Sequence, residues 1–350
     1  MSRAREIADL GSPAASGLSN RSLIINGAMT VDQRHDGSSF TIVNGNATTG
    51  VIADRFRVNE TSGAVMTGQR VADAPVEFEY SSKLTVTTAD SSLGSTEFHR
   101  MIQPIEGKNI SNLNWGTSNA KTLTLTFYVK SSLTGQYYIS VFNNAADRTL
   151  LKGYTISSAN TWEKKTITYP GDTTGALDND NARILDLNFW LGVGSDFSSG
   201  TLNTSWNSST NANRVVGQVN AQDNTSNNIY FTGIQLEAGT SASDFEFLPF
   251  DVNFDRCQRY FQTCFLNIFV LARYDAGSGT PINCFIYPKE MRASPTYGTT
   301  GTFTTTSGFA GTPTGGDIKT MSIALTGANS EAANDIVYAN GGSITLNAEL

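Results

Sequence analysis

The chain has 350 residues, 39% of them hydrophobic and only 16% charged, a composition typical of short strands and polar turns rather than helical bundles. Its length predicts two or three domains. The net charge of −7 argues against the clustered basic surface that nucleic-acid binding requires, and no run of 18 apolar residues predicts a membrane span.

Residues 1–22 are predicted to form an N-terminal segment and a linker. Helix formers fill the first ten positions, and Gly11-Ser-Pro13 opens a stretch rich in Gly, Ser and Asn. A helix this short is marginal in water by itself. It is either a docking element that folds on a partner surface or a disordered terminus, and the residues alone leave both open. The segment lacks the charged and then apolar pattern of a signal peptide.

Residues 23–249 are predicted to form an all-β domain, an antiparallel sandwich. In the clearest strand, Lys121–Lys130, apolar residues occupy every second position. Some ten such runs, separated by turn residues and without intervening helices, favour this fold class. The predicted strands are Leu23–Asn26, Arg55–Val58, Ala64–Thr67, Phe78–Thr87, Ser95–Gln103, Lys121–Lys130, Tyr137–Phe142, Leu150–Ile156, Trp162–Tyr169, Ile184–Gly192 and Asn228–Glu237.

A long polar insertion, Gly194–Asn227, interrupts these strands. A loop of this length in a compact domain is usually functional or packed against a neighbour, and this one would suit contacts between subunits. Its few apolar anchors are Phe197, Leu202, Trp206, Val215 and Val216.

Residues 250–350 are predicted to form a helix followed by a second, smaller β-sandwich. The helix, over residues 250–264, is indicated by helical spacing of Phe254, Cys257, Tyr260, Phe261 and Cys264. Only three cysteines occur, without a CxxC pair, which argues against a zinc site or a disulfide framework. The predicted strands are Phe265–Arg273, Asn283–Tyr287, Phe303–Thr306, Ile318–Leu325 and Ile344–Leu346.

Several motifs in chain order resemble tail fibres and related virion proteins of tailed bacteriophages, especially marine ones. These motifs are Ile25-Asn-Gly-Ala-Met29 with Gln33-Arg34, Asp54-Arg-Phe56, Thr232-Gly-Ile-Gln-Leu-Glu-Ala-Gly239, Phe245-Glu-Phe-Leu-Pro-Phe250, Cys257-Gln-Arg-Tyr-Phe261, Met291-Arg-Ala-Ser-Pro-Thr296 and Asn347-Ala-Glu-Leu350. They are structural rather than chemical, so they point to a class of protein and not to a ligand.

Residues 23–249 also resemble jelly-roll carbohydrate-binding modules. The resemblance rests on an opening Asn26-Gly, the strand Thr126-Phe-Tyr-Val-Lys130, the strand Thr161-Trp-Glu-Lys-Lys-Thr-Ile167 and a closing strand that ends in Gln-Leu-Glu237. Modules with a structural calcium ion carry an acidic pair in the closing strand, and this chain does not. No cofactor is therefore expected beyond a structural calcium ion, for which Glu237 is the weak candidate ligand.

The tail-fibre resemblance implies a homotrimer that docks on a phage tail protein through its N-terminus, with Arg3, Arg5, Ile7 and Leu10 as the docking residues. The C-terminal β domain would contact the host, and a host surface polysaccharide would be the ligand. Neither nucleic acid nor membrane insertion is implied. The protein would be made in the host cytoplasm and built into the tail of the virion.

Exposed aromatic rings are the expected glycan contacts, because sugars stack on them while amides and carboxylates bind the hydroxyl groups. Trp115 and Trp206 lie in polar loops, and in the pair Tyr137-Tyr138 one ring must face outward. A tryptophan that pins its own loop is the alternative for both loop residues. Trp162 and Trp190 lie in strands and are expected in the core.

We expect no enzymatic activity. His35 and His99 lack the motifs of nucleophilic or metal-dependent hydrolysis. Paired carboxylates would be needed for glycan cleavage, and two groups are considered: Glu77 with Glu79 on one strand face, and Asp178, Asp180 and Asp186. Solvent-facing acidic residues are the commoner interpretation of both.

The function predicted from sequence is that of a phage virion structural protein, a tail fibre or receptor-binding appendage that adheres to a host glycan. A head decoration or other tail accessory protein is the alternative within the virion. A free carbohydrate-binding module and a glycan depolymerase are the alternatives of other classes.

Overall fold

The computed structural model describes residues 21–45, 50–268, 282–300, 304–305, 310–326 and 339–350. The docking residues Arg3, Arg5, Ile7 and Leu10 lie outside these ranges. The chain forms two compact units that divide between Asn253 and Phe254, within the single described α-helix, α2 (Phe250–Gln258). The boundary expected from the sequence, between residues 249 and 250, lies four residues earlier.

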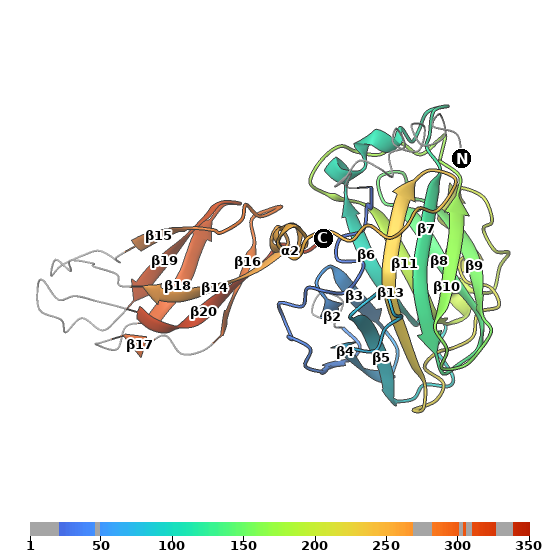
Figure 1. Cartoon of the computed structure of the whole chain (residues 1–350), viewed down its shortest axis with the longest axis horizontal. Coiled ribbons are helices and arrows are strands. Elements are labelled where there is room, and N and C mark those ends of the chain that lie inside the picture. Colours follow the sequence, from blue (N-terminus) through green and yellow to red (C-terminus); the bar gives the residue numbers. More distant parts are fainter. Residues whose placement is uncertain (1–20, 46–49, 269–281, 301–303, 306–309, 327–338) are drawn as a thin grey trace, which may run out of the picture. The chain divides into compact units, whose positions relative to one another are not determined.

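The first unit is the expected antiparallel jelly-roll sandwich (Figure 1). Its first sheet contains, in spatial order, β1 (Phe40–Ile42), β4 (Val65–Val71), β5 (Ser81–Thr88), β13 (Asn228–Ala238), β7 (Leu123–Ser131) and β10 (Glu163–Tyr169). Its second sheet contains β12 (Asn207–Ser208), β9 (Arg148–Ile156), β8 (Gly135–Asn143), β11 (Arg183–Val193), β6 (Phe98–Glu106), β3 (Phe56–Glu60) and β2 (Val51–Ala53).

One continuous core lies between the two sheets. The alternation in β7 is confirmed, because Leu125, Phe127 and Val129 are all buried in that core. Phe189 of β11 meets Phe127 from the opposite sheet, with ring centroids 5.5 Å apart and nearly perpendicular planes. The inward-facing side chains of the second sheet thus supply the other half of the core, as expected when two half-buried sheets pack face to face.

The predicted strand Leu23–Asn26 is wrong, although the segment is buried. The Gln103 side chain accepts from Ile25 N (2.8 Å) and donates to Ile25 O (2.9 Å). It thus occupies the backbone N–H and C=O groups that would otherwise bond to a neighbouring strand. Asn26 then turns with a φ of 62°. Gly27 O accepts from Ile234 N at 3.0 Å, which holds the turn against β13.

The insertion Gly194–Asn227 folds back on the outer face of the second sheet. It contains two short 3-10 helices, η3 (Ser195–Phe197) and η4 (Asn211–Asn213), and β12, which pairs with the edge of β9. Val215 and Phe197 are buried, so these expected anchors are confirmed. They pack in a second apolar cluster that contains Trp190 of β11. The insertion is therefore a fixed cover on its own domain.

The second unit contains two small antiparallel sheets. One has the order β14 (Phe261–Ile268), β20 (Ala339–Asn347), β16 (Thr296–Thr300), with β17 (Thr304–Thr305) on β20. The other has the order β15 (Ile282–Ile286), β19 (Thr320–Thr326), β18 (Ala310–Gly316).

Two further 3-10 helices, η1 (Gly107–Asn109) and η2 (Ser111–Leu113), belong to the first unit. Residues 269–273 of one predicted strand, and residues 303 and 306 of another, lie outside the described ranges.

The helix predicted over residues 250–264 is too long. It ends at Gln258, and Tyr260 N donates to Cys257 O at 2.9 Å in the turn that follows. Phe261 and Cys264 instead lie in β14, which pairs along its length with β20. The apolar residues at these positions have helical spacing, but pairing with the distant strand β20 holds Phe261 and Cys264 in a strand instead.

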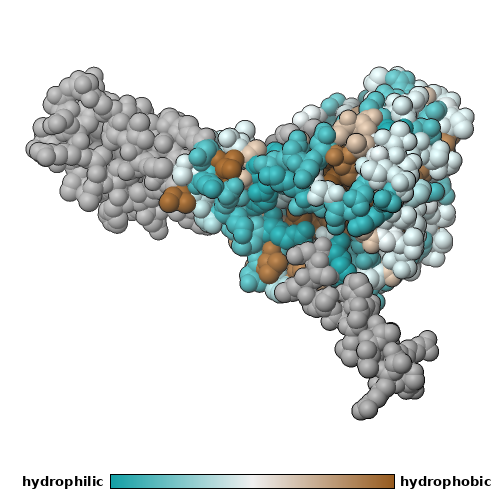
Figure 2. Space-filling model, turned by 90° about the horizontal axis from the view of Figure 1, so that it is seen from above, coloured by the Kyte–Doolittle hydropathy of each residue, from teal (hydrophilic) through white to brown (hydrophobic). Residues whose placement is uncertain are grey.

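The surface of the first unit carries no large apolar patch in the view of Figure 2, where isolated brown groups are separated by teal. The exposed large hydrophobic residues within its described part are Val43, Val76, Phe247 and Phe250. Among the described residues, no helix combines the length and the apolar composition that a membrane span requires.

Candidate functional site

The outer face of the second sheet carries an unusual set of polar side chains. In an antiparallel ladder, residues directly opposite each other point to the same side. The register pairs Arg100 with Trp190, Ser140 with Asn188, and Phe142 with Asp186. The neighbouring positions on these strands point into the core, so this face combines charged, amide, hydroxyl and aromatic groups across β6, β8 and β11.

A hollow of about 170 Å³, here called the arginine pocket, opens on this face beside the insertion. Its lining includes Arg100, Arg183, Arg214, Asp186, Asn188 and Ser140. Arg214 comes from the insertion, whereas the other five come from the sheet. The Arg100 guanidinium lies 4.9 Å from the ring centre of Trp190, and that of Arg214 lies 5.8 Å from Phe142. Aromatic faces therefore fix two of the three guanidinium groups.

A second and wider hollow of about 450 Å³, here called the polar trough, is formed by the insertion. Its lining includes Thr204, Ser205, Asn207, Ser208, Thr210 and Asn213. Asn207 pairs with Thr149, which lines the arginine pocket, so the two hollows are neighbours across the edge of β9. Hydroxyl and amide groups in an open groove are suited to a ligand that offers many hydroxyl groups.

The four aromatic residues expected to bind a ligand lie in three different places. Tyr137 is buried and its hydroxyl donates to Leu133 O at 3.1 Å, so Tyr138 is the ring that faces outward. Tyr138 packs at the cluster beneath the insertion, and its N–H donates to Gln218 Oε1 at 2.9 Å. It thus supports the insertion from below.

Trp115 and Trp206 meet each other, with ring centroids 4.9 Å apart. Trp115 is buried and donates to Lys121 O at 2.8 Å, and half-buried Trp206 donates to Pro170 O at 2.7 Å. Both indole N–H groups are therefore used inside the protein. This placement matches the alternative in which each tryptophan pins its own loop, and we assign neither to the ligand face.

Trp162 and Trp190 differ from the expectation that both lie in the core. Trp190 is buried, but beneath the insertion rather than between the sheets. Trp162 is half-buried on the outer face of the first sheet, where it donates to Asp73 Oδ1 at 3.2 Å and its ring lies 6.1 Å from that of Tyr230. Lys130 lies over both rings and pairs with Asp73. These groups satisfy one another.

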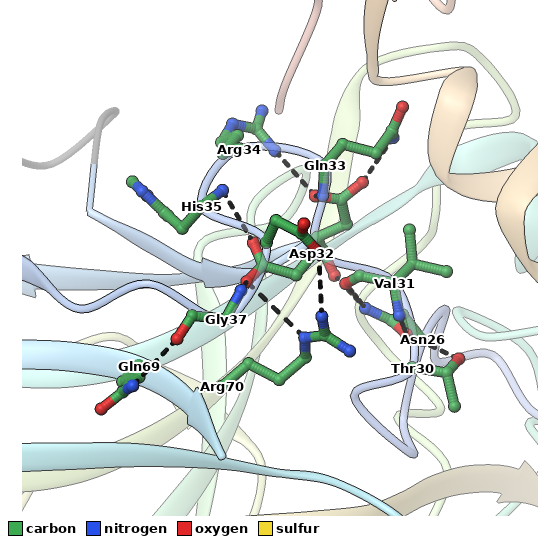
Figure 3. A network of polar contacts seen from close by, with 12 residues as sticks. Asn26, Thr30, Val31, Asp32, Gln33, Arg34, His35, Gly37, Gln69 and Arg70 are labelled. Carbon is green, nitrogen blue, oxygen red and sulfur yellow. Dashed lines mark hydrogen bonds and ion pairs between the residues drawn. The ribbon is translucent and has the colours of Figure 1, made fainter. Parts of the chain in front are cut away.

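Acidic residues near the N-terminal turn form a closed network (Figure 3). Asp32 accepts from His35 N at 3.1 Å and from Gly37 N at 2.8 Å, and Arg70 lies 3.6 Å away. Asp54 accepts from Gln33 N at 3.2 Å and pairs with Arg34 at 3.3 Å. The bonds are those of a structural brace that fixes the loop, and they account for Gln33, Arg34 and Asp54 of the sequence motifs.

His35 is half-buried, and His99 is fully buried. His35 stacks on Phe40 with ring centroids 4.0 Å apart, and burial lowers its pKa. His99 is buried, and burial lowers its pKa to about 3, so it is neutral at pH 7. Neither is placed beside the pocket or the trough.

The acidic residues considered for catalysis are scattered. Glu77 and Glu79 are exposed and precede β5, so the expectation that they share a strand face is wrong. Asp178 and Asp180 are exposed, whereas Asp186 is buried and paired with Arg183. No carboxylate pair flanks either hollow among the lining residues of the described chain.

Glu237 is engaged by hydrogen bonds. Its carboxylate accepts from Ser243 N at 2.8 Å, from Ser243 Oγ at 2.7 Å and from Gln235 Nε2 at 3.2 Å. Within the described ranges, no group of three or more His, Cys, Asp or Glu side chains is arranged to hold a metal ion. Glu237 thus ties the end of β13 to the segment that follows it.

The three arginines of the pocket escape sequence-based prediction. They belong to β6, to the start of β11 and to the insertion, and they are more than 100 positions apart at the extremes. The insertion itself was the available signal, because its length marks it as functional or packed. Only the sheet register and the fold of the insertion bring the arginines together.

Comparisons with known proteins give weak likenesses. No protein-family model matches the chain, and no curated protein matches it either. A solved tailspike domain of bacteriophage CBA120, described as enzymatically active, is 16% identical at a TM-score of 0.32, and the match covers 56% of this chain and 21% of that one. This chain therefore spans far less than the length of the tailspike.

Two further structures match similar parts of the chain. A family 11 carbohydrate-binding module of Clostridium thermocellum, solved with a mixed-linked tetrasaccharide, is 13% identical at a TM-score of 0.30, covering 58% of this chain and 98% of that one. A putative sugar-binding protein of Bacteroides thetaiotaomicron is 14% identical at 0.32, covering 63% and 100%. At these scores, family and function must be argued from the site itself.

Proposed function

We propose that the protein is a non-catalytic glycan-binding adhesin of a bacteriophage virion, a tail fibre or related tail appendage. The observation that carries the binding role is the pair of neighbouring hollows on the outer face of the second sheet. One offers hydroxyl and amide groups in the open, and the other offers guanidinium groups beside aromatic rings. Such linings bind a polyhydroxylated chain by many weak polar contacts.

Binding without cleavage is supported by the placement of the acidic residues. Glycoside hydrolysis uses two carboxyl groups about 5–10 Å apart across the scissile bond. The carboxylate that lines the arginine pocket, Asp186, is already paired with Arg183. Incubation of the full chain with the polysaccharide that it binds should leave the polymer length unchanged on a gel, and shortening would refute the non-catalytic part of the proposal.

The location on the tail rests on the sequence motifs that resemble tail fibres. Assembly as a homotrimer and docking on a tail protein through Arg3, Arg5, Ile7 and Leu10 belong to the same proposal. Several copies per particle would multiply weak contacts into firm adhesion. Immunogold labelling of virions should place the chain on the tail, whereas labelling on the head would favour a decoration protein.

Removing hydroxyl groups from the polar trough should weaken binding. We expect the double variant Thr204→Ala with Thr210→Ala to bind the glycan about fivefold to tenfold more weakly, since each lost hydrogen bond contributes about 0.5–1.5 kcal/mol. Both residues are exposed, so folding should be unchanged. An array of bacterial surface polysaccharides identifies the ligand, and titration calorimetry gives the dissociation constants.

The matched control is Thr166→Ala with Thr168→Ala. These two threonines are also exposed, but they lie on β10 at the outer face of the first sheet. The control should bind as the wild type does. Equal weakening in both double variants, or weakening in the control alone, would place the ligand outside the trough.

A further inference from the structure

The arginine pocket has more positive charge than its own carboxylate neutralises. Three guanidinium groups and one carboxylate line it. Arg183 binds Asp186 in a bidentate manner, with Nε donating to Oδ1 and Nη2 to Oδ2. The ion pairs within the described residues include neither Arg100 nor Arg214. The positive charges of Arg100 and Arg214 are therefore available to an anion from outside the protein.

Both of these arginines lose hydration in the pocket. Burial lowers the pKa of Arg100 to about 10, although Asp186 acts in the opposite direction, so Arg100 still carries its charge at neutral pH. Burial also lowers the pKa of Arg214 more than nearby Asp147 raises it. Arg214 Nη2 donates to Ser209 Oγ at 2.6 Å. A desolvated guanidinium without a carboxylate partner is unfavourable, and an anion from outside would offset this.

Two buried polar atoms at the pocket have no hydrogen-bond partner among the residues that the structure describes. Arg100 Nε is a donor without an acceptor, and Asn188 Oδ1 is an acceptor without a donor. The Asn188 side chain is 1% exposed and lines the pocket. A fully deprotonated inorganic anion such as sulfate or chloride would satisfy the arginine, but it has no hydrogen to donate to the asparagine oxygen. A ligand that satisfies both must carry a negative group and a hydroxyl group close together.

Acidic sugars have this combination. The volume of about 170 Å³ lies below the roughly 300 Å³ at which pockets for larger ligands begin. It therefore suits one sugar ring, or one substituent of a longer glycan whose chain continues outside.

We propose that the arginine pocket is an anion subsite for a single acidic sugar, in which Arg100 and Arg214 bind a carboxylate or sulfate ester. Asn188 Oδ1 accepts a hydroxyl of the same sugar. Arginine suits this role, since its planar fork matches carboxylate and sulfate oxygens. This inference rests on the glycan-binding function proposed above and adds that the glycan is acidic. In a chain with a net charge of −7, the selection must come from the pocket and not from the overall field.

The test uses the full-length protein and small probes of known charge. Sodium glucuronate and glucose 6-sulfate supply the two kinds of anion, glucose is the neutral partner, and ionic strength is held constant. Arginine side-chain resonances in nitrogen-15 NMR report binding at the site. We expect Arg100 and Arg214 to shift with at least one acidic probe, at about tenfold lower concentration than any shift with glucose. The probe that shifts them separates carboxylate from sulfate.

Three variants give the site its controls. Arg214→Gln should weaken binding of the acidic probe about tenfold or more, and Arg214→Lys should restore part of it because the charge remains while the fork is lost. Lys164→Gln removes one charge from the exposed outer face of the first sheet and should change nothing. Thermal unfolding of each variant verifies that it is folded.

The outcomes distinguish failure of the anion subsite from failure of the glycan-binding function. No arginine shift with either acidic sugar up to about 100 mM, or equal weakening by Arg214→Gln and Lys164→Gln, overturns the anion subsite. If neutral polysaccharides bind and the trough variants weaken them, the proposed function stands while the acidic selection fails. If no polysaccharide of the array binds, the proposed function fails.

Discussion

Replacing Gly27 by alanine should destabilise the first unit by about 3 kcal/mol or more. A Cβ atom at this position would lie 2.0 Å from Ile234 O and 3.0 Å from Ile234 C. Both are backbone atoms of β13, which lies between β5 and β7 inside the first sheet. No side-chain rotation can relieve such a contact, so either the N-terminal turn or β13 must move. The hydrogen bond from Ile234 N to Gly27 O would be lost with it.

The measurement is thermal unfolding of the full chain, followed by a probe of the first unit such as tryptophan fluorescence. For a domain of this size the change corresponds to a fall in Tm of roughly 6–12 °C. Gly63→Ala is the matched control, because its Cβ would meet only Asp90 Oδ2 at an ordinary 3.5 Å. A Tm for the Gly27 variant within about 2 °C of that control would contradict the packing of the turn against β13.

Replacing Trp190 by alanine should cost about 3–5 kcal/mol and release the insertion from the second sheet. The indole is 1% exposed and its Nε1 donates to Ser140 Oγ at 3.0 Å. Its ring lies 5.9 Å from that of Phe98 and 6.4 Å from that of Phe197. Removing it leaves a cavity at the point where the insertion meets the sheet, and it removes the face on which Arg100 rests.

Limited proteolysis and glycan titration of the Trp190→Ala variant would report both consequences. We expect cleavage within residues 194–227 to become faster than in the wild type, together with a loss of glycan binding. Trp162→Ala is the control, since its half-buried ring lies on the opposite sheet. If the two variants are equally resistant to proteolysis and bind equally well, Trp190 does not anchor the insertion.

Much of the sandwich follows from local patterns. β7, β8, β9, β10, β11 and β13 all lie where alternation or apolar runs predict strands, because each buries one face in a shared core. The short strands β1, β2 and β12 escape prediction, since two or three residues carry no period. β16 and β18 are also missing from the predicted strands, because Thr and Gly dominate them and give no apolar alternation, and they form strands by pairing with β20 and β19.

The candidate site was predicted less well than the fold. Local context distinguishes a tryptophan in a polar loop from one in a strand, yet it cannot show that the N–H of Trp206 is already taken by Pro170 O. Nor does any local pattern bring Arg100 and Arg214 together, since this requires the register of β6 with β11 and the return of the insertion. The candidate site depends on long-range contacts, which no short window of the sequence encodes.

A structure of the full chain with a fragment of its glycan bound would locate the binding site directly. We expect density on the outer face of the second sheet, in the polar trough, with an acidic sugar group between Arg100 and Arg214. Density over Trp162 and Tyr230 on the outer face of the first sheet, or on the second unit alone, would contradict this expectation.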